Sequence, residues 1–408
     1  MRRRELTRRE FIENTALAGL ALGVSLPFGR QITQKEANRP KIVYRTLGKT
    51  GLRLPVVSFG VMNSDSPDLL RKALDLGVRH LDTAHGYMGG KSEEVIGTIV
   101  AERKCRQQVC ISTKLWFARD REGRFLSADR GPNLGVTQEN FDRMLSVSLK
   151  RLQTDYVDIL YLHNCHQGAM VTYEPLLKMF EAAKKKGLAR FVGVSTHSNE
   201  PEVIRTAVDT GVWDVVLTAY NFLQEHRAEI RAAIKYAAEK GVGIVAMKTQ
   251  AGARVNQRQS VNHAAALKWV LNDENVCTTI PGVTTFEQLA LDWGVMGNLR
   301  LTEEEERDLQ LSARSSEPYY CQGCRTCIEM CPAHVEIPTA MRAYMYAYGY
   351  GNAAQAGQAL AEFADEQGLA PCRSCERCVV SCPHGIPVHA RVQSMLAASV
   401  VPAGAALF

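Results

Sequence analysis

The middle of the chain alternates eight times between short apolar, β-branched runs and helical periodicity, from Val56 to about Asn298. The predicted strands lie at Val56–Met62, Arg79–Thr83, Val109–Lys114, Val157–His163, Phe191–Thr196, Val215–Tyr220, Val242–Lys248 and Cys277–Pro281. Eight such units in about 245 residues match a (β/α)8 barrel in number and length. A doubly wound sheet is disfavoured because no G-x-G-x-x-G run follows the first strand. The sequence therefore predicts an α/β fold, a TIM barrel.

Amphipathic helices are predicted between these strands, and several end at a glycine that suits a helix C-cap. The clearest helices lie at Leu69–Leu76, Ser92–Arg103, Gln138–Leu152 and Glu225–Lys240. Ahead of the barrel, Tyr44–Leu54 alternates around a Gly-Lys-Thr-Gly turn. This segment predicts a hairpin that covers the barrel floor.

Functional residues of such barrels lie at the C-terminal ends of the strands. Asp82 and Tyr87 follow the second predicted strand, Lys114 ends the third and His163 ends the fourth. One barrel mouth therefore receives an aspartate, a tyrosine, a lysine and a histidine. A lysine beside a tyrosine favours the phenolate, so we expect Lys114 to make Tyr87 more acidic.

These four residues and the opening YRTLGKTGL hairpin resemble the aldo-keto reductase superfamily over about residues 44–298. The resemblance implies carbonyl and alcohol chemistry on a small substrate, with NAD(P)H as the hydride carrier. Tyr87 would then deliver the proton, Lys114 and Asp82 would support it, and His163 would position the carbonyl.

The resemblance also implies nicotinamide contacts at the ends of later strands. The matching residues are Ser195, Thr196, Tyr220, Asn221, Pro281 and Gly282. Leu217 stands where the family often has a glutamine, and the loop after the last strand lacks the basic residues that often grip a 2′-phosphate. NADPH, NADH and weak or absent nicotinamide binding all stay open.

Several residues near the strand ends have two interpretations. His85, His166 and His197 either line a substrate pocket or lie in solvated loops. Trp116 and Phe117 either form pocket walls or pack in the core.

Two copies of the pattern C-x2-C-x2-C-x3-C-P dominate the C-terminal region. The cysteines are Cys321, Cys324, Cys327 and Cys331, then Cys372, Cys375, Cys378 and Cys382. This run holds two 4Fe-4S clusters in two-cluster ferredoxins, where the fourth cysteine of each copy ligates the other cluster. We therefore expect Cys331 and Cys382 to cross over. Zinc and disulfides are competing interpretations of the cysteines.

The helical spacer between the two runs resembles α-helical ferredoxin domains on redox enzymes. The predicted domains are a signal and linker at 1–41, the barrel at 42–300, a linker at 301–316 that is itself helical, and the two-cluster domain at 317–408.

The N-terminus carries most of the net charge. The whole chain has a formal charge of +6, and residues 1–41 hold nine arginines and lysines against four glutamates. Nucleic-acid binding therefore has no support. Thr7–Ile12 resembles the twin-arginine export signal, and the apolar run after it is too short to span a membrane. We expect a periplasmic or extracytoplasmic protein, or a cytoplasmic one if the signal is unused.

Two functional hypotheses follow. The first is a barrel oxidoreductase whose clusters exchange electrons with a redox partner protein. The second is an electron-transfer protein whose barrel is a non-catalytic scaffold. A nicotinamide transfers two electrons as hydride whereas each cluster carries one, so the two centres do not exchange electrons directly without a converter.

Overall fold

The computed structural model describes residues 41–120, 122–130, 133–251, 261–315, 320–362, 368–375 and 377–398. The predicted twin-arginine segment, Thr7–Ile12, lies outside the described residues. No helix in the described ranges is both long and apolar enough to cross a membrane.

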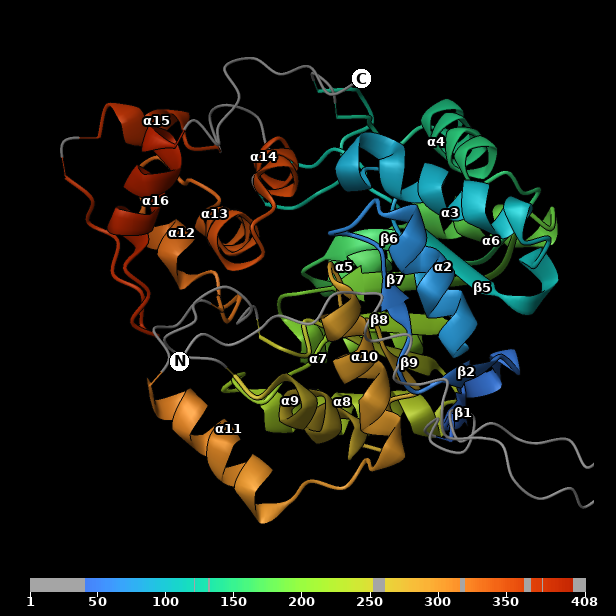
Figure 1. The fold of residues 1–408 in the computed structure, drawn as a ribbon. Coiled ribbons are helices and arrows are strands. Elements are labelled where there is room, and N and C mark those ends of the chain that lie inside the picture. Colours follow the sequence, from blue (N-terminus) through green and yellow to red (C-terminus); the bar gives the residue numbers. More distant parts are fainter. Residues whose placement is uncertain are drawn as a thin grey trace, which may run out of the picture. The chain divides into compact units, whose positions relative to one another are not determined.

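Eight parallel strands form one sheet in chain order. They are β3 (Phe59–Gly60), β4 (His80–Asp82), β5 (Cys110–Leu115), β6 (Val157–Cys165), β7 (Ala189–Thr196), β8 (Val215–Ala219), β9 (Gly243–Met247) and β10 (Thr278–Thr279). Parallel bridges from Val57 to Thr279 and from Gly60 to Gly282 join the two edges into a nearly closed barrel. The predicted TIM barrel is confirmed, and Figure 1 shows helices around its strands.

The helices of the barrel follow the predicted alternation. They are α2 (Pro67–Leu76), α3 (Lys91–Glu102), α4 (Gln138–Arg151), α5 (Gly168–Val171), α6 (Glu174–Lys185), α7 (Glu200–Asp209), α8 (Arg227–Glu239), α9 (His263–Leu271) and α10 (Phe286–Gly294). In α2, the Ser66 side chain accepts a hydrogen bond from the Leu69 N–H and Gly77 ends the helix at φ 105°. Both ends thus satisfy backbone groups that a helix leaves unpaired.

The N-terminal hairpin packs against the barrel interior at the N-terminal ends of the strands. Strands β1 (Tyr44–Thr46) and β2 (Arg53–Pro55) pair antiparallel. Leu47 and Leu54 are buried against inward-facing strand residues such as Val245. The Lys49 N–H donates to the Gly241 carbonyl just before β9, 2.8 Å away. The predicted hairpin therefore lies at the N-terminal ends of the strands, which leaves their C-terminal ends for the site.

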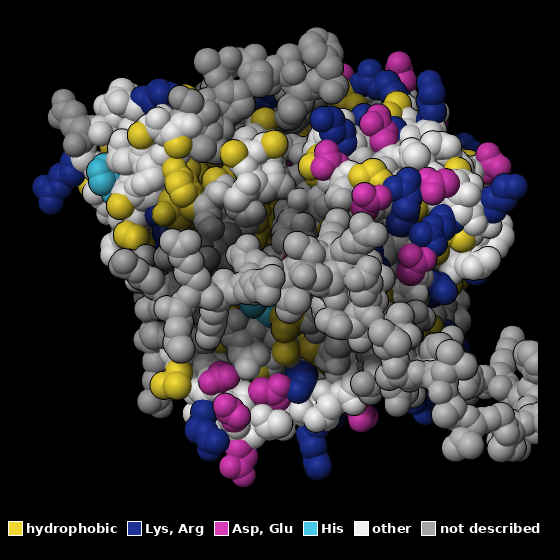
Figure 2. Space-filling view, in the orientation of Figure 1, with side chains coloured by type: hydrophobic (Ala, Val, Ile, Leu, Met, Phe, Trp, Pro, Cys, Tyr) yellow, Lys and Arg dark blue, Asp and Glu magenta, His cyan; other side chains and the backbone are white. Residues whose placement is uncertain are grey.

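The C-terminal region is helical, as its spacing predicts. The linker forms α11 (Glu303–Ser315), and the following elements are α12 (Thr326–Met330), α13 (Ile337–Tyr344), the π-helical turn η5 (Met345–Gly349), α14 (Ala353–Leu360), α15 (Ala370–Arg373) and α16 (Val388–Ala397). On the face that Figure 2 shows, lysine and arginine side chains alternate with aspartate and glutamate side chains.

This helical region packs over the C-terminal ends of the barrel strands. A shared apolar cluster joins Met62, Ala84 and Tyr87 of the barrel to residues of α13, η5 and α14. Gln358 of α14 donates to the carbonyl of Gly86. Asn133 Nδ2 donates to the Ala361 carbonyl at 2.9 Å. The barrel mouth is therefore covered by the region that carries the cysteines.

Candidate functional site

Asp82 and Lys114 form a buried ion pair at the base of the barrel mouth. Asp82 ends β4, and Lys114 is the penultimate residue of β5. Lys114 Nζ lies 2.5 Å from Asp82 Oδ1 and also donates to the Thr83 carbonyl at 2.6 Å. Parallel neighbours bring the ends of adjacent strands together, so the pairing follows from the sheet order. The lysine charge is matched by a carboxylate within the same site.

Tyr87 and His163 lie next to this pair. Tyr87 begins the short helix η2 (Tyr87–Gly90), whose next residue Met88 has a left-handed φ of 55°. Lys114 Nζ lies 4.9 Å from the centroid of the Tyr87 ring. The His163 ring meets the Tyr87 ring edge-on, with centroids 5.8 Å apart. The structure therefore brings all four predicted residues to one place.

Burial controls the protonation of these side chains. Burial raises the pKa of Tyr87 well above its ordinary value, and Asp82 adds to the rise. Burial lowers the pKa of His163 well below its ordinary value, helped by the charge of Lys114. The expectation that Lys114 would make Tyr87 more acidic is not met. Its charge is already compensated by Asp82, so desolvation of the phenolate decides the direction.

A polar chain beneath Asp82 was not expected from the sequence. Ser112 Oγ donates to Asp82 Oδ2 at 2.7 Å, and His80 Nε2 lies 3.0 Å from Ser112 Oγ. Burial lowers the pKa of His80 to about 4, which keeps its ring neutral at pH 7. The second Asp82 oxygen is thereby held in place. The sequence signal for these hydrogen bonds was the presence of polar residues, His80, Asp82 and Ser112, in two successive buried strands.

A cavity of about 180 Å³ opens between Tyr87, Lys114 and His163 on one side and the C-terminal helices on the other. Its wall combines Tyr87, His163 and Trp116 of the barrel with Gln355, Gln358 and Glu362 of the C-terminal region. Phe117 instead is fully buried in the core and stacks on Phe141, with centroids 6.3 Å apart. Of the two aromatic candidates, Trp116 is the pocket wall and Phe117 is core.

The three histidines differ in their surroundings. His85 lines the same cavity, and its Nδ1 lies 3.0 Å from Ser148 Oγ. His197 Nδ1 lies 3.0 Å from Asn164 Oδ1. Burial lowers the pKa of His166 well below its ordinary value. All three are half-buried.

Pro281 and Gly282 line a second, smaller cavity beside Asp82 and Tyr87. Its volume is about 60 Å³, which is room for about two water molecules. Tyr350 of the C-terminal region forms part of its wall. A nicotinamide ring with its amide needs more room, so the described arrangement does not fit this group.

The other residues assigned to a nicotinamide have partners of their own. Ser195 Oγ accepts from the Asn164 N–H at 2.8 Å, and Thr196 Oγ1 donates to the Ser198 carbonyl at 2.8 Å. Asn221 Nδ2 donates to the Lys248 carbonyl at 3.2 Å. These contacts fix the strand ends around the mouth.

Tyr220 lies elsewhere, which corrects its assignment to the mouth. Its hydroxyl accepts from Arg231 Nε at 3.0 Å, and its ring lies 5.0 Å from the Trp269 ring. Successive strand residues point to opposite faces, and Tyr220 shares the outward face with Val216. It therefore faces the helices that surround the barrel.

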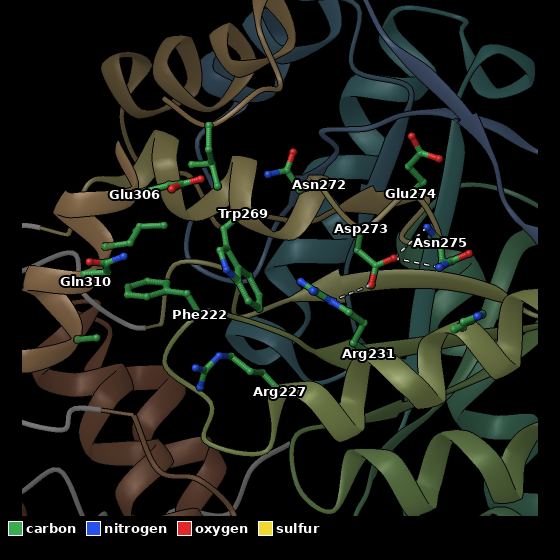
Figure 3. A pocket seen from close by; sticks show the side chains of 14 residues that line it. Phe222, Arg227, Arg231, Trp269, Asn272, Asp273, Glu274, Asn275, Glu306 and Gln310 are labelled. Carbon is green, nitrogen blue, oxygen red and sulfur yellow. Dashed lines mark hydrogen bonds and ion pairs between the residues drawn. The ribbon is translucent and has the colours of Figure 1, made fainter. Parts of the chain in front are cut away.

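Trp269 and Arg231 also line a larger outer groove of about 700 Å³ between α8, α9 and α11 (Figure 3). The Arg231 side chain points toward Asp273, with 3.9 Å between Nε and Oδ2. None of the four predicted catalytic residues lines this groove. The chemistry-bearing side chains gather at the mouth instead.

Lys248, at the end of β9, is a mouth residue that sequence reasoning did not single out. It lines the 60 Å³ cavity, and its Nζ lies 4.7 Å from the Tyr346 ring and 5.7 Å from the Tyr350 ring. Burial lowers its pKa to about 7, and Arg342 contributes. Its φ of 55° is a left-handed conformation that is rare outside glycine. Such strain is concentrated at functional sites.

The thiols fall into two groups that each combine both cysteine runs. Burial raises the pKa of Cys327 to about 12, and the nearby thiols of Cys321, Cys324 and Cys382 add to the rise. Cys382, the last cysteine of the second run, thus lies near the first three cysteines. This grouping has the expected crossover.

The second group combines three cysteines of the second run with the last cysteine of the first run. Burial raises the pKa of Cys372 to about 11, and Cys331, Cys375 and Cys378 contribute. Each cubane would be held by three cysteines of one run and the fourth of the other, and the grouping of the thiols fits two 4Fe-4S clusters. Within the described ranges, no three His, Cys, Asp or Glu side chains converge on a single metal ion. Thiolates of a cubane bind different iron atoms and need no such convergence.

The first run lies against the barrel. A Cβ atom at Gly323 would collide with Ser198, in the loop after β7. Cys321 lines a small cavity together with His197 and Lys248. Lys248 therefore borders both the cysteines of the first run and the cavity next to Tyr87.

Comparisons with known proteins agree with these two regions. Residues 58–263 match the sequence model of the aldo/keto reductase family, and residues 320–395 match that of the 4Fe-4S dicluster domain. L-glyceraldehyde 3-phosphate reductase of Escherichia coli (strain K12) is 26% identical over 326 residues, covering 64% of this chain and 90% of its own.

Two further similarities concern the barrel. L-galactose dehydrogenase of Arabidopsis thaliana is 29% identical over 218 residues, covering 50% of this chain and 64% of its own. The holo structure of an aldo-keto reductase from Bacillus halodurans has a TM-score of 0.54 at 23% identity, covering 68% of this chain and 98% of its own. This structural likeness supports the fold.

Proposed function

The chain belongs to the aldo/keto reductase family, and we propose that it is an oxidoreductase that converts a small carbonyl compound to its alcohol at the barrel mouth. Its 4Fe-4S dicluster domain would exchange electrons with a partner protein. Asp82, Tyr87, Lys114 and His163 are the proposed catalytic residues.

The observation that carries this proposal is that the Tyr87 and His163 rings lie together at the cavity of about 180 Å³, with centroids 5.8 Å apart. Reduction of a carbonyl adds two electrons and two protons, one of them at oxygen. The raised pKa of Tyr87 keeps its hydroxyl protonated at pH 7, so it is a proton donor to the developing alkoxide. The neutral His163 ring orients the carbonyl oxygen without adding charge.

Lys114 and Asp82 support Tyr87 without changing the net charge of the site. The ion pair is buried, and its lysine lies under the tyrosine ring. The ammonium stabilises negative charge that develops on the substrate oxygen and is passed to Tyr87 when the proton leaves. In reduction Tyr87 donates its proton, and in the reverse oxidation the resulting phenolate would take it back.

The reduction adds a hydride at the carbonyl carbon and a proton at oxygen, whereas each cluster carries one electron, so the clusters alone do not complete it. A nicotinamide would supply the hydride when bound, and its ring would need Tyr350 to leave the wall of the 60 Å³ cavity. The cysteines of the first run lie against the barrel, so their cluster is the proposed centre nearer the mouth. The second cluster would exchange electrons with the partner.

Similar proteins support the reaction class. Their names describe a reductase of L-glyceraldehyde 3-phosphate and a dehydrogenase of L-galactose. Both names describe interconversion of a carbonyl and an alcohol on a hydroxylated compound. We propose the same class here and a smaller, uncharged substrate, as argued below.

The test uses anaerobically purified protein with its clusters in place. Small aldehydes and ketones are added to the reduced protein, with and without NADPH or NADH, and alcohol formation is followed by NMR. The expected result is alcohol formation in the natural protein and its loss in Tyr87→Phe, with iron near eight atoms per chain in both. Equal alcohol formation in both proteins would contradict a catalytic Tyr87, and no alcohol in either would favour a scaffold barrel.

A further inference from the structure

The mouth cavity is small enough to restrict its ligand by size. Its volume of about 180 Å³ equals the liquid volume of about six water molecules. A ligand that reaches Tyr87 and also fills the cavity therefore has about five or six non-hydrogen atoms. Sugars and phosphorylated trioses would extend beyond this space.

The charges that line the cavity are already balanced. Lys114 pairs with Asp82 at 2.5 Å. Arg151 Nη1 lies 3.2 Å from Glu93 Oε2.

Glu362, on the opposite wall, is balanced in the same way. Its Oε2 lies 3.1 Å from Arg342 Nη2 and accepts from Asn164 Nδ2 at 3.2 Å. A carboxylate or phosphate would have to compete with these existing partners for a cation. The balance favours a neutral ligand, since a buried charge needs a partner of its own.

Two polar atoms of the cavity wall are buried without a hydrogen bond to any described residue: Trp116 Nε1 and Gln355 Oε1. The Gln355 side chain is nearly enclosed, since the residue is 5% exposed. An indole N–H only donates and an amide oxygen only accepts. A buried polar group without a partner is unfavourable, and such groups in native proteins call for an explanation.

A single hydroxyl group is able to accept from an indole N–H and to donate to an amide oxygen. We infer that the cavity takes a neutral hydroxycarbonyl compound, with its carbonyl at Tyr87 and His163 and its hydroxyl between Trp116 and Gln355. Gln355 is then a specificity-determining residue that the cluster-carrying region supplies to the barrel. This inference rests on the proposed function and names its substrate class.

The test compares two ketones of equal size. Hydroxyacetone and 2-butanone each have five non-hydrogen atoms and differ by a hydroxyl in place of a methyl group. Binding to the holoprotein is measured by ligand-observed NMR titration, without turnover. We expect hydroxyacetone to bind about tenfold more tightly, because 2-butanone leaves both wall atoms unpaired.

Variants test whether the hydroxyl is read by these two residues. Gln355→Met and Trp116→Phe should each remove most of the preference for hydroxyacetone and leave 2-butanone binding unchanged. The double variant should lose little more than either single variant, since both residues act through one hydroxyl. Gln138→Met, on the exposed side of α4, is the matched control and should keep the preference. Iron content verifies that each variant is folded.

The outcomes separate this inference from the proposed function. Equal binding of both ketones to the natural protein would overturn the inference and leave carbonyl reduction standing. Tighter binding of dihydroxyacetone phosphate than of dihydroxyacetone would overturn the neutral-ligand argument. Binding of neither ketone would overturn both.

Discussion

Lys114 Nζ lies 2.5 Å from Asp82 Oδ1 at the base of the barrel mouth, and neither side chain is more than 3% exposed. Asp82 offsets the charge of Lys114, so burial is the larger influence on Tyr87 and raises its pKa. This direction agrees with the proposed role of Tyr87 as a proton donor.

Replacing Tyr87 by phenylalanine should lower the rate of carbonyl reduction by about a hundredfold or more, because the proton donor is lost. Alcohol formation under single-turnover conditions measures the effect. Tyr161→Phe is a matched control, since Tyr161 is also fully buried in the barrel and its hydroxyl has no partner among the described residues. An equal loss in both variants would mean that the effect is structural.

Replacing Asp82 by asparagine should destabilise the barrel by about 3–5 kcal/mol, because it leaves the buried Lys114 ammonium without its counterion. Urea unfolding followed by circular dichroism measures the change. The double variant Asp82→Asn, Lys114→Met should recover part of this loss. Asp68→Asn, at an exposed ion pair with Arg71, is the control and should change little. Equal effects of the two asparagine substitutions would contradict the prediction.

The rate of carbonyl reduction should be nearly independent of pH between about pH 6 and pH 9. The raised pKa of Tyr87 keeps the hydroxyl protonated over this range, and the lowered pKa of His163 keeps its ring neutral. Neither group changes charge, so neither limits the rate. A pH–rate profile at constant ionic strength checks this. A limb in this range that persists in Lys248→Met would disprove it, because burial lowers the pKa of the neighbouring Lys248 to about 7.

Paired cysteine substitutions should show which thiols share a cluster. Cys331→Ala with Cys372→Ala removes two ligands of one predicted cluster and should leave about four irons per chain. The double variant Cys331→Ala, Cys327→Ala removes two cysteines of a single run. These cysteines belong to different predicted clusters, so this variant should retain fewer than about four irons per chain. Iron and sulfide analysis with electron paramagnetic resonance measures this. If the variant with both substitutions in one run retained more iron than the other variant, each run would hold its own cluster.

Truncating Tyr350 should strengthen nicotinamide binding, because its ring forms part of the wall of the 60 Å³ cavity beside Pro281 and Gly282. NADPH fluorescence titration of Tyr350→Ala should give a dissociation constant at least about tenfold lower than for the natural protein. Tyr348→Ala is the control, since Tyr348 lies in the same turn and does not line this cavity. Tight NADPH binding by the natural protein would show that the C-terminal region moves away.

The alternation of the barrel could be read from the sequence because strand and helix periods are local properties. Each of the eight predicted strands is present, and the helix-ending Gly77 adopts the left-handed φ that its position required. Strand order then brought Asp82 and Lys114 side by side. The pairing of Tyr87 with His163 followed from the same rule.

The composite nature of the site could not be read in this way. Gln355, Gln358 and Glu362 lie in α14 or just after it, nearly 200 residues beyond His163. Their approach to the mouth depends on apolar packing of the C-terminal helices and on contacts such as Gln358 to Gly86. The assignment of Tyr220 to the mouth was wrong for a related reason. Its position at a strand end does not determine whether the side chain points into the barrel or toward the outer helices.

The sequence by itself determined the barrel, the four polar residues of its mouth and the two cysteine runs, since periodicity and ligand spacing are encoded locally. Only the tertiary structure decided that the cysteine-bearing region covers the mouth and that burial raises the pKa of Tyr87. Burial and long-range packing set these properties, and both depend on which surfaces meet when the chain folds.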